Sequence, residues 1–167
     1  MVAGATDRRA ELLALLDRVM DPEVPVLSVV ELGIVRDVEL DGDAVTVVVT
    51  PTYSGCPAIR VIEEDILAAL AAGGYPDARV RTTFAPAWTT EWIGADAREK
   101  LRAYGIAPPG PAAVDELVPL LRRAPSVACP YCGSTRTELR SEFGSTACKA
   151  TLYCTACQQP FEQFKSI

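Results

Sequence analysis

The sequence predicts an α+β domain followed by a small module that is built around a metal ion. Three observations carry this prediction. Helical and strand-like apolar patterns alternate along the N-terminal part, a proline-rich segment follows, and the C-terminal part contains two Cys-x-x-Cys pairs. We therefore expect an α+β domain at residues 1–106, a linker with a short helix at 107–126, and a zinc ribbon at 127–167.

The first expected elements are a helix and a hairpin. Apolar residues recur at helical spacing from Asp7 to Met20, which predicts an amphipathic helix that Asp7 caps and Asp21-Pro22 stops. Two valine-rich runs, ending at Leu40 and starting at Val45, then flank the turn-like Asp41-Gly42-Asp43. This arrangement is typical of a β-hairpin.

A helix, a strand and another helix are expected next. Residues 59–70 carry an apolar stripe that Gly73-Gly74 ends, and a third strand is expected at Arg79–Phe84. A further helix is expected within Trp88–Tyr104, capped by Thr90 or Asp96 and closed by Gly105. Trp88 and Trp92 would share a face of that helix, and we expect both in the core.

Composition and charge narrow the classes of function. Hydrophobic residues make up 49% of the chain, which predicts a true core, and the net charge of −6 argues against binding to nucleic acid or to an anionic membrane. Without an export signal or an apolar run of roughly 20 residues, a cytoplasmic protein is expected. The absence of histidine excludes His-bearing zinc sites and Ser-His-Asp or Cys-His nucleophiles.

Four cysteines are the predicted metal ligands: Cys129, Cys132, Cys154 and Cys157. They form two knuckles separated by the 21 residues 133–153, and the intervening segments predict a hairpin that brings the knuckles together. Four thiolates in a tetrahedral array favour a structural zinc ion, because such a site leaves no open coordination position. A mononuclear iron site and an iron–sulfur cluster remain alternatives, whereas a disulfide framework suits a secreted chain better.

Two features of the ribbon bear on its partners. Its positive and negative side chains nearly balance before the thiolates are counted, so docking to protein is favoured over binding to nucleic acid. The fifth cysteine of this region, Cys148, is interpreted as a small buried residue, with a thiol for metal transfer as the alternative.

A reactive loop is predicted at Thr50–Pro57. Cys56 is expected at the N-cap of the second helix, with Pro57 in the first helical position. The helix dipole, with help from Arg60, would stabilise a thiolate there, although a purely structural cysteine fits the pattern equally well. Asp21, Glu23 and Glu31 are solvated or structural carboxylates, or else they add oxygen ligands to a transient metal site at Cys56.

Several of these motifs resemble known families. Asp21-Pro22-Glu23-Val24-Pro25, Glu31-Leu32-Gly33-Ile34-Val35 and Tyr53-Ser54-Gly55-Cys56-Pro57 resemble the small α+β domain of the iron–sulfur assembly family that includes the SufT-like proteins. The Cys129–Cys157 ribbon, with Phe143-Gly144-Ser145-Thr146 and Phe161-Glu162-Gln163-Phe164-Lys165, is similar to the PaaD family of the phenylacetyl-CoA epoxidase system.

The resemblance implies an accessory, non-catalytic component of aerobic phenylacetate catabolism. Cys56, aided by Asp21 and Glu23, would hold iron or an iron–sulfur cluster transiently and deliver it to the oxygenase or the reductase of the system. A purely structural docking subunit is the alternative, and an independent enzyme is weakly supported, since no phosphate-binding or dinucleotide motif is present. Homo-oligomerisation stays open.

Overall fold

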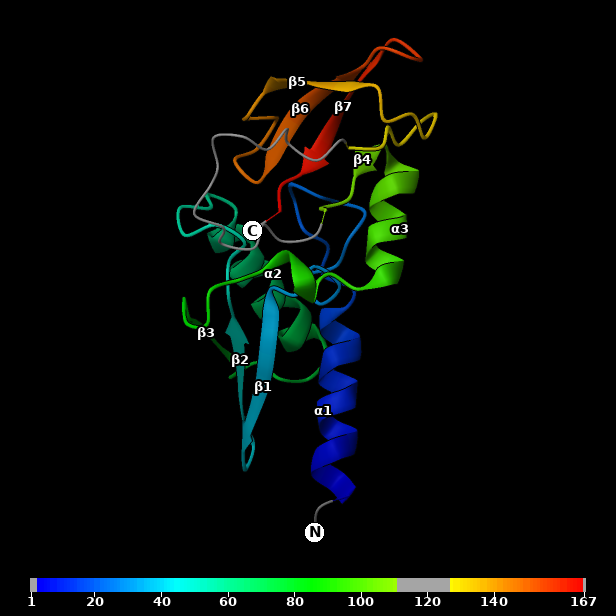
Figure 1. Cartoon of the computed structure of the whole chain (residues 1–167). Helices are drawn as coiled ribbons and strands as arrows, with labels where there is room; N and C mark the ends of the chain where they lie inside the picture. The colour runs from blue at the N-terminus through cyan, green and yellow to red at the C-terminus, as the bar shows by residue number, and fades with distance from the viewer. Residues whose placement is uncertain (1–2, 111–126, 167) are drawn as a thin grey trace. The chain divides into compact units, whose positions relative to one another are not determined.

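The computed structural model describes residues 3–110 and 127–166, with side chains from Asp7 onward (Figure 1). The chain forms two compact units, Met1–Trp88 and Thr89–Ile167, and each is described by itself. Most of the linker expected at 107–126, including its short helix, lies outside the described residues. The domain boundary expected after residue 106 therefore stays a prediction.

The first unit is a three-stranded sheet with two helices. Its elements are α1 (Ala3–Leu16), β1 (Val35–Asp41), β2 (Ala44–Val49), α2 (Ile59–Ala72) and β3 (Arg79–Thr82). The strand order is β1-β2-β3, with β1 and β2 antiparallel and β2 and β3 parallel. In Figure 1, α2 lies behind the sheet and α1 runs alongside β1. The predicted α+β class and the predicted order of these elements are confirmed.

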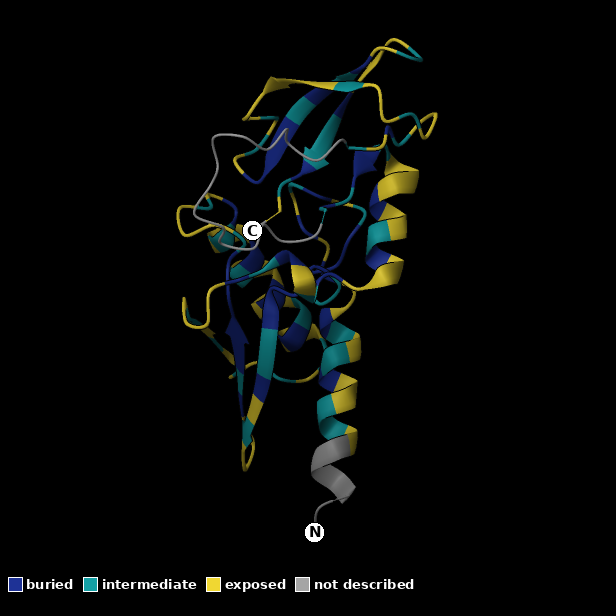
Figure 2. Ribbon diagram, in the orientation of Figure 1, coloured by how far each residue is buried: buried dark blue, intermediate teal, exposed yellow. Residues whose placement is uncertain are grey.

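The core of this unit lies between α2 and the sheet. Ile62, Ile66 and Leu70 recur every four residues along one side of α2, and all three are buried. Val47 and Val49 of β2 are also completely buried. Burial of one such side chain contributes roughly 1.5–3 kcal/mol, so this apolar layer fixes the helix on the sheet. Figure 2 shows the buried stripes of the strands.

The first helix differs from its prediction at both ends. It begins at Ala3, so Asp7 lies inside the helix and is not its cap. It ends at Leu16 because the chain tightens there: the Val19 N–H bonds to the Leu16 carbonyl, three residues back. Met20 lies beyond the helix, exposed and bridged to a later segment, so the Asp21-Pro22 pair is not what stops it.

The helix predicted within Trp88–Tyr104 is confirmed as α3 (Ala95–Tyr104), and a 3₁₀ turn, η1 (Thr90–Trp92), precedes it. The caps are Thr89 and Gly94, so neither Thr90 nor Asp96 caps a helix, and the two tryptophans do not share a helix face. Gly105 closes α3 at φ 94°, as predicted, because this left-handed conformation suits glycine.

Trp88 belongs to the core of the first unit, as predicted. Its side chain is buried, and its indole N–H donates to the Leu32 carbonyl at 3.0 Å. Trp92, in the second unit, is half-buried. Trp88 therefore ties the end of the first unit to the segment before β1.

The second unit carries a four-stranded sheet. Its strands are β4 (Ile106–Ala107), β5 (Thr137–Ser141), β6 (Lys149–Cys154) and β7 (Gln159–Phe164), in the order β4-β7-β6-β5. The predicted β5–β6 hairpin is confirmed, whereas β4 and β7 were not predicted. Ala107, Ala150, Leu152 and Phe161 form a small core with the buried Cys129 and Cys154.

No helix within residues 3–110 or 127–166 combines the length and the apolarity that a bilayer crossing requires.

Candidate functional site

The four ribbon cysteines converge on one point. The Cys129 and Cys157 sulfurs lie 3.7 Å apart, the Cys132 and Cys154 sulfurs lie 3.6 Å apart, and all four lie within 4.8 Å of one another. Within the described part of the chain, no other group of three or more potential metal-ligating side chains is this close. The sequence prediction that these four residues assemble is confirmed.

The two knuckles share one backbone geometry. The Gly133 N–H donates to the Cys129 carbonyl, and the Gln158 N–H donates to the Cys154 carbonyl, each at 2.9 Å. Both donors follow the second cysteine of a pair, and both adopt positive φ, 71° for Gly133 and 60° for Gln158. Each knuckle is thus a tight turn that points two sulfurs the same way.

The spacing of the sulfurs fits a tetrahedral metal. A bond of about 2.3 Å from metal to sulfur gives edges of about 3.8 Å in a regular tetrahedron, close to the two short distances above. A disulfide needs about 2.05 Å, so these sulfurs are not bonded to each other. Geometry therefore supports four separate ligands and no open position.

The electrostatics of the cluster favour a bound cation. The N–H of Cys157, followed by that of Ala156, lowers the pKa of Cys154 to about 6 against the effect of burial. Burial, together with the neighbouring sulfurs, raises the pKa of Cys157 to about 12. Without a metal, these opposite shifts disfavour four thiolates at neutral pH, and a bound divalent ion would supply the positive charge that four thiolates need.

Exposure differs among the four ligands. Cys129 and Cys154 are buried in the small core of the ribbon, Cys157 is half-buried, and Cys132 is exposed. Solvent and competing ligands therefore reach the cluster first at Cys132.

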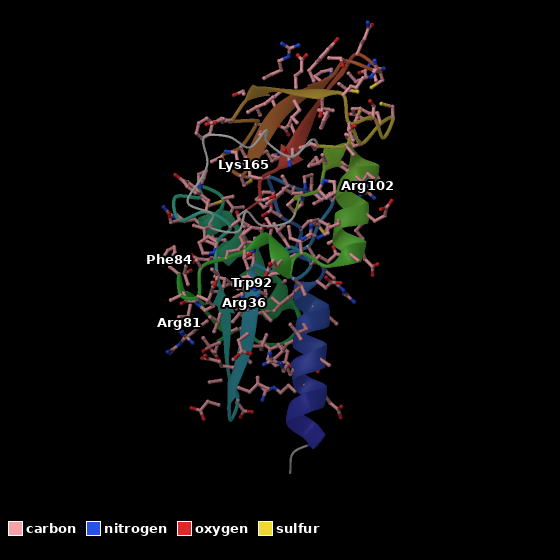
Figure 3. All side chains as sticks on the ribbon, viewed as in Figure 1. Arg36, Arg81, Phe84, Trp92, Arg102 and Lys165 are labelled. Atoms are coloured by element: carbon pink, nitrogen blue, oxygen red, sulfur yellow. The ribbon has the colours of Figure 1, made fainter. Side chains whose placement is uncertain are left out.

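An ion pair braces the loop between β5 and β6. The Glu162 carboxylate accepts hydrogen bonds from the backbone and the hydroxyl of Ser145, and it pairs with the buried Lys149 ammonium at 3.2 Å. The Lys165 ammonium donates to the Ala147 carbonyl at 2.8 Å; Figure 3 labels Lys165 at the end of the ribbon. The loop is held at several points along its backbone.

Cys148, in the same loop, is buried, which confirms the simpler interpretation of this thiol. Its sulfur lies 3.1 Å from the Thr146 hydroxyl oxygen, and its carbonyl accepts from the Lys165 N–H. A role as a small buried side chain is enough to account for this cysteine, without a metal-binding role.

Cys56 lies in a turn before α2 and not at the N-cap, where it was expected. The N-cap is Ala58, whose backbone is already helical at φ −74° and ψ −15°. Proline presets a φ suited to a turn, so Pro57 and Ala58 form a separate turn in which the Ile59 N–H approaches the Cys56 carbonyl at 3.4 Å. Cys56 is half-buried, so it is not enclosed in the core of the unit.

The position of this loop in the sheet is informative. The loop follows the carboxyl end of β2, beside the carboxyl end of the parallel strand β3, where open α/β sheets commonly bind ligands. The hydroxyl oxygen of Thr50, which starts the loop, is buried and finds no hydrogen-bond partner among the described residues. Buried hydroxyl groups are normally hydrogen-bonded. The Thr50 hydroxyl could therefore bind a polar group that is not part of the described chain. Sequence analysis missed Thr50; a polar residue ending a run of valines was the available indication.

The predicted carboxylates have clear backbone roles. Asp21 is buried, and one of its oxygens accepts from the N–H groups of Glu23 at 2.8 Å and Val24 at 2.7 Å. This is an Asx turn, which shapes the chain after α1. Asp21 and Glu23 do not form with Cys56 a set of three mutually close ligands, so their role at Cys56 stays a prediction.

Glu31 takes part in a capping box. Its carboxylate accepts from the Ser28 N–H at 3.1 Å, and the Ser28 hydroxyl oxygen accepts from the Glu31 N–H at 3.0 Å. The Ser28 hydroxyl in turn donates to Asp17 at 2.5 Å. These contacts account for Glu31 as a structural residue.

Two family models match this chain. An iron–sulfur cluster assembly protein family matches residues 9–82, and the PaaD zinc beta ribbon domain matches residues 114–165. The first match contains the Cys56 loop and the second contains all four clustered cysteines.

Known proteins are similar over the same regions. A protein of Escherichia coli K12, provisionally named as a subunit of 1,2-phenylacetyl-CoA epoxidase, is 46% identical over 94% of this chain and 92% of its own length. The Fe-S protein maturation auxiliary factor YitW of Bacillus subtilis is 34% identical over 50% of this chain and 82% of its own. A crystal structure of a DUF59 domain from Bacillus anthracis, 29% identical, superposes on 56% of this chain and 90% of its own with a TM-score of 0.53.

Proposed function

The chain belongs to the PaaD family, with an iron–sulfur assembly domain and a PaaD zinc ribbon, and on this premise we propose that it is an accessory component of a phenylacetyl-CoA epoxidase system. In this proposal it has no catalytic activity of its own. It holds iron or an iron–sulfur cluster transiently at Cys56 and delivers it to the oxygenase or the reductase of the system.

The observation that carries this proposal is the setting of Cys56. Cys56 is half-buried, lies outside the four-cysteine cluster, and follows the carboxyl end of a strand that runs parallel to its neighbour. The buried Thr50 hydroxyl, which bonds to nothing in the described chain, offers a second polar group at the start of the same loop. A thiolate is a suitable ligand for iron, and a single protein thiolate holds an ion weakly enough to release it.

Asp21 and Glu23 are the proposed helpers of Cys56. Their carboxylates would add oxygen ligands beside the Cys56 sulfur and so complete a mixed ligand set for a transient ion. One oxygen of the Asp21 carboxylate accepts from the two backbone N–H groups of the turn after α1. Asp21→Asn tests the two roles of Asp21 separately. The asparagine side-chain oxygen can still accept the hydrogen bonds of the turn, whereas the charged carboxylate proposed to bind the ion is lost.

The ribbon takes a structural role in this proposal. Zinc, held by Cys129, Cys132, Cys154 and Cys157, would neutralise part of the thiolate charge and fix the two knuckles. A closed site with four sulfur ligands supplies folding energy and no open position for chemistry. The ribbon is therefore proposed to dock on protein partners, in keeping with the net charge of −6 of the chain.

The experiment is complementation in cells that lack the native gene. Cys56→Ser should abolish support of phenylacetyl-CoA epoxidation while the protein accumulates normally. Cys148→Ser is the matched control, because this thiol is buried and should be dispensable. Full epoxidase activity with Cys56→Ser would refute delivery through this thiol.

A docking-only subunit is the second candidate, and one observation favours it. Phe143 is 66% exposed in the braced β5–β6 loop, with the Lys165 ammonium 4.4 Å from the ring centroid. A rigid exposed aromatic is typical of an interface anchor. This candidate predicts stable co-purification with the oxygenase that Phe143→Ser weakens and Cys56→Ser leaves intact.

A further inference from the structure

Two short sulfur contacts join the two knuckles of the ribbon. The Cys132 sulfur lies 3.6 Å from the Cys154 sulfur, and the Cys129 sulfur lies 3.7 Å from the Cys157 sulfur. Movement of roughly 1.6 Å brings either pair to the disulfide length of about 2.05 Å. Either contact could therefore become a covalent link between the knuckles.

The two pairs differ in how easily an oxidant reaches them. Cys132 is the exposed member of the four ligands, whereas Cys157 is half-buried and Cys129 and Cys154 are only 2% and 0% exposed. The residue before Cys132, Tyr131, is also exposed. The oxidation of a thiolate depends on its exposure. An oxidant in solution therefore reaches Cys132 first, and the Cys154 sulfur is in contact with it.

We propose that Cys132 and Cys154 form a peroxide-sensitive redox switch, in which oxidation joins them in a disulfide and the ribbon releases its zinc ion. The inference concerns the regulation of the four-cysteine site and does not depend on iron delivery by Cys56. Either of the two can therefore fail without the other.

The oxidant in this reaction is one molecule of hydrogen peroxide. The Cys132 sulfur attacks one peroxide oxygen, the O–O bond breaks, and the departing hydroxide takes up a proton, which leaves a sulfenic acid and water. The Cys154 thiolate then attacks the Cys132 sulfur, the S–O bond breaks, and this second hydroxide also leaves as water. The two sulfurs together lose two electrons, which reduce the peroxide to two water molecules. The metal ion stays divalent.

Loss of two ligands explains the release of the ion. Only Cys129 and Cys157 remain, whereas structural zinc sites have four protein ligands. The two remaining thiolates take up protons from solvent when the ion leaves. The core of the ribbon is small, so the bound ion supplies much of its folding free energy. The disulfide still links the knuckles, so its reduction by a dithiol restores a site that zinc can occupy again.

The first knuckle also touches the helix of the second unit. A Cβ atom added to Gly105, which closes α3, would lie 2.9 Å from the Tyr131 hydroxyl oxygen, so the tyrosine ring packs on the end of the helix. The strand β4 follows directly and pairs with β7. Opening of the knuckle therefore removes a contact from α3 as well as the metal from the ribbon.

The test follows zinc, thiols and the fold in the zinc-loaded full-length chain. Hydrogen peroxide is added at neutral pH, released zinc is measured with a chromophoric chelator, and dimedone traps the sulfenic acid. Disulfides are mapped by mass spectrometry of peptides after alkylation. Cys56→Ser and Cys148→Ser are the controls, because both thiols lie outside the cluster.

We expect peroxide to speed zinc release about tenfold or more in wild type and in both controls. Dimedone should label Cys132 first, and one disulfide between Cys132 and Cys154 should form for each zinc ion released. Dithiothreitol with added zinc should then restore slow amide exchange in β6 and at the end of α3.

Two single variants keep the test decisive although each lacks a zinc ligand. Cys132→Ser and Cys157→Ser are both treated with peroxide in excess zinc. The disulfide between Cys132 and Cys154 should still form in Cys157→Ser, whereas disulfide formation at Cys154 should be about tenfold slower in Cys132→Ser. Equal rates at Cys154 in the two variants would mean that the exposed sulfur is not the one that peroxide attacks.

Other outcomes would also overturn the switch. Zinc release without any disulfide would indicate irreversible over-oxidation, and a first disulfide within one knuckle or between Cys129 and Cys157 would assign the reaction to other sulfurs. Retention of zinc while peroxide oxidises Cys56 would mean that the cluster is not redox-sensitive. None of these results bears on iron delivery by Cys56, which the complementation experiment tests.

Discussion

Replacing Glu162 by glutamine should weaken the ribbon by about 3 kcal/mol. The Lys149 ammonium, 3.2 Å from the Glu162 carboxylate, has a side chain that is only 5% exposed. Removing one member of a buried ion pair lowers the free energy of unfolding by about 3–5 kcal/mol, because the remaining charge is left without a partner in surroundings of low dielectric constant. The lower figure applies here, since Glu162 is 27% exposed and glutamine keeps an oxygen for the Ser145 N–H.

The same ion pair gives the ribbon a defined dependence on pH. Burial alone would raise the pKa of Glu162, but the Ser145 N–H and hydroxyl and the Lys149 ammonium together hold it below its ordinary value. A carboxyl group whose pKa is lower in the folded state contributes stability above its unfolded pKa of about 4.3. That contribution is lost as the pH falls through the folded pKa. The difference between wild type and Glu162→Gln should therefore be full at neutral pH and narrow below about pH 4.

Amide hydrogen exchange in the zinc-loaded chain measures this effect. A loss of about 3 kcal/mol corresponds to exchange roughly 100-fold faster for the amides of β6 and β7. Glu138→Gln is the control: Glu138 pairs with Arg140 at 3.0 Å, but both side chains are more than half exposed. That change should cost less than about 0.5 kcal/mol. Equal effects of the two substitutions would refute the reasoning.

Four further predictions concern the fold and the metal. Gln158→Gly should stabilise the ribbon by about 1 kcal/mol, because φ at Gln158 is 60°, and a higher urea concentration for zinc release would verify it. Arg98→Lys should destabilise the second unit by about 2 kcal/mol, since its guanidinium bonds three backbone carbonyls and an ammonium cannot match that geometry; exchange in α3 reports it. Trp88→Phe should cost the first unit about 1–2 kcal/mol in urea denaturation, through the lost indole hydrogen bond. Cys132→Ser should speed zinc release to a chelator at least tenfold, while Cys148→Ser leaves the rate unchanged.

Each of these has an opposing result. Unchanged zinc retention in Gln158→Gly would mean that the turn carries no strain. Wild-type exchange in Arg98→Lys, or wild-type denaturation of Trp88→Phe, would make the respective hydrogen bonds energetically neutral. Slow zinc release from Cys132→Ser would show that three cysteines suffice.

The ribbon was the most predictable part, for a physical reason. Its ligands lie in two short motifs, and the metal geometry dictates that the motifs meet, so Cys129 and Cys154 could be placed together from sequence. The flanking strands β4 and β7 were not foreseen. β4 has only two residues, Ile106 and Ala107, and pairs with residues 162 and 163, so no local periodicity reveals it.

Helix ends were the least predictable feature of the first unit. The apolar pattern continues to Met20, but three-residue hydrogen bonds replace the helical ones after Leu16, and helix propensity does not predict this change. At Cys56, the preference of proline for the first helical turn suggested an N-cap, whereas Pro57 begins a separate turn. The lack of a hydrogen-bond partner for the Thr50 hydroxyl among the described residues depends on the groups that the fold brings around it, which the sequence does not reveal.

Zinc and iron, measured together after anaerobic loading, test the central claim most directly. We predict that wild type and Cys56→Ser each retain about one zinc ion per chain in the four-cysteine site, while only wild type acquires iron. Equal iron in the two proteins, or iron that enters only by displacing zinc, would contradict the claim that the ribbon holds zinc while the Cys56 loop holds iron.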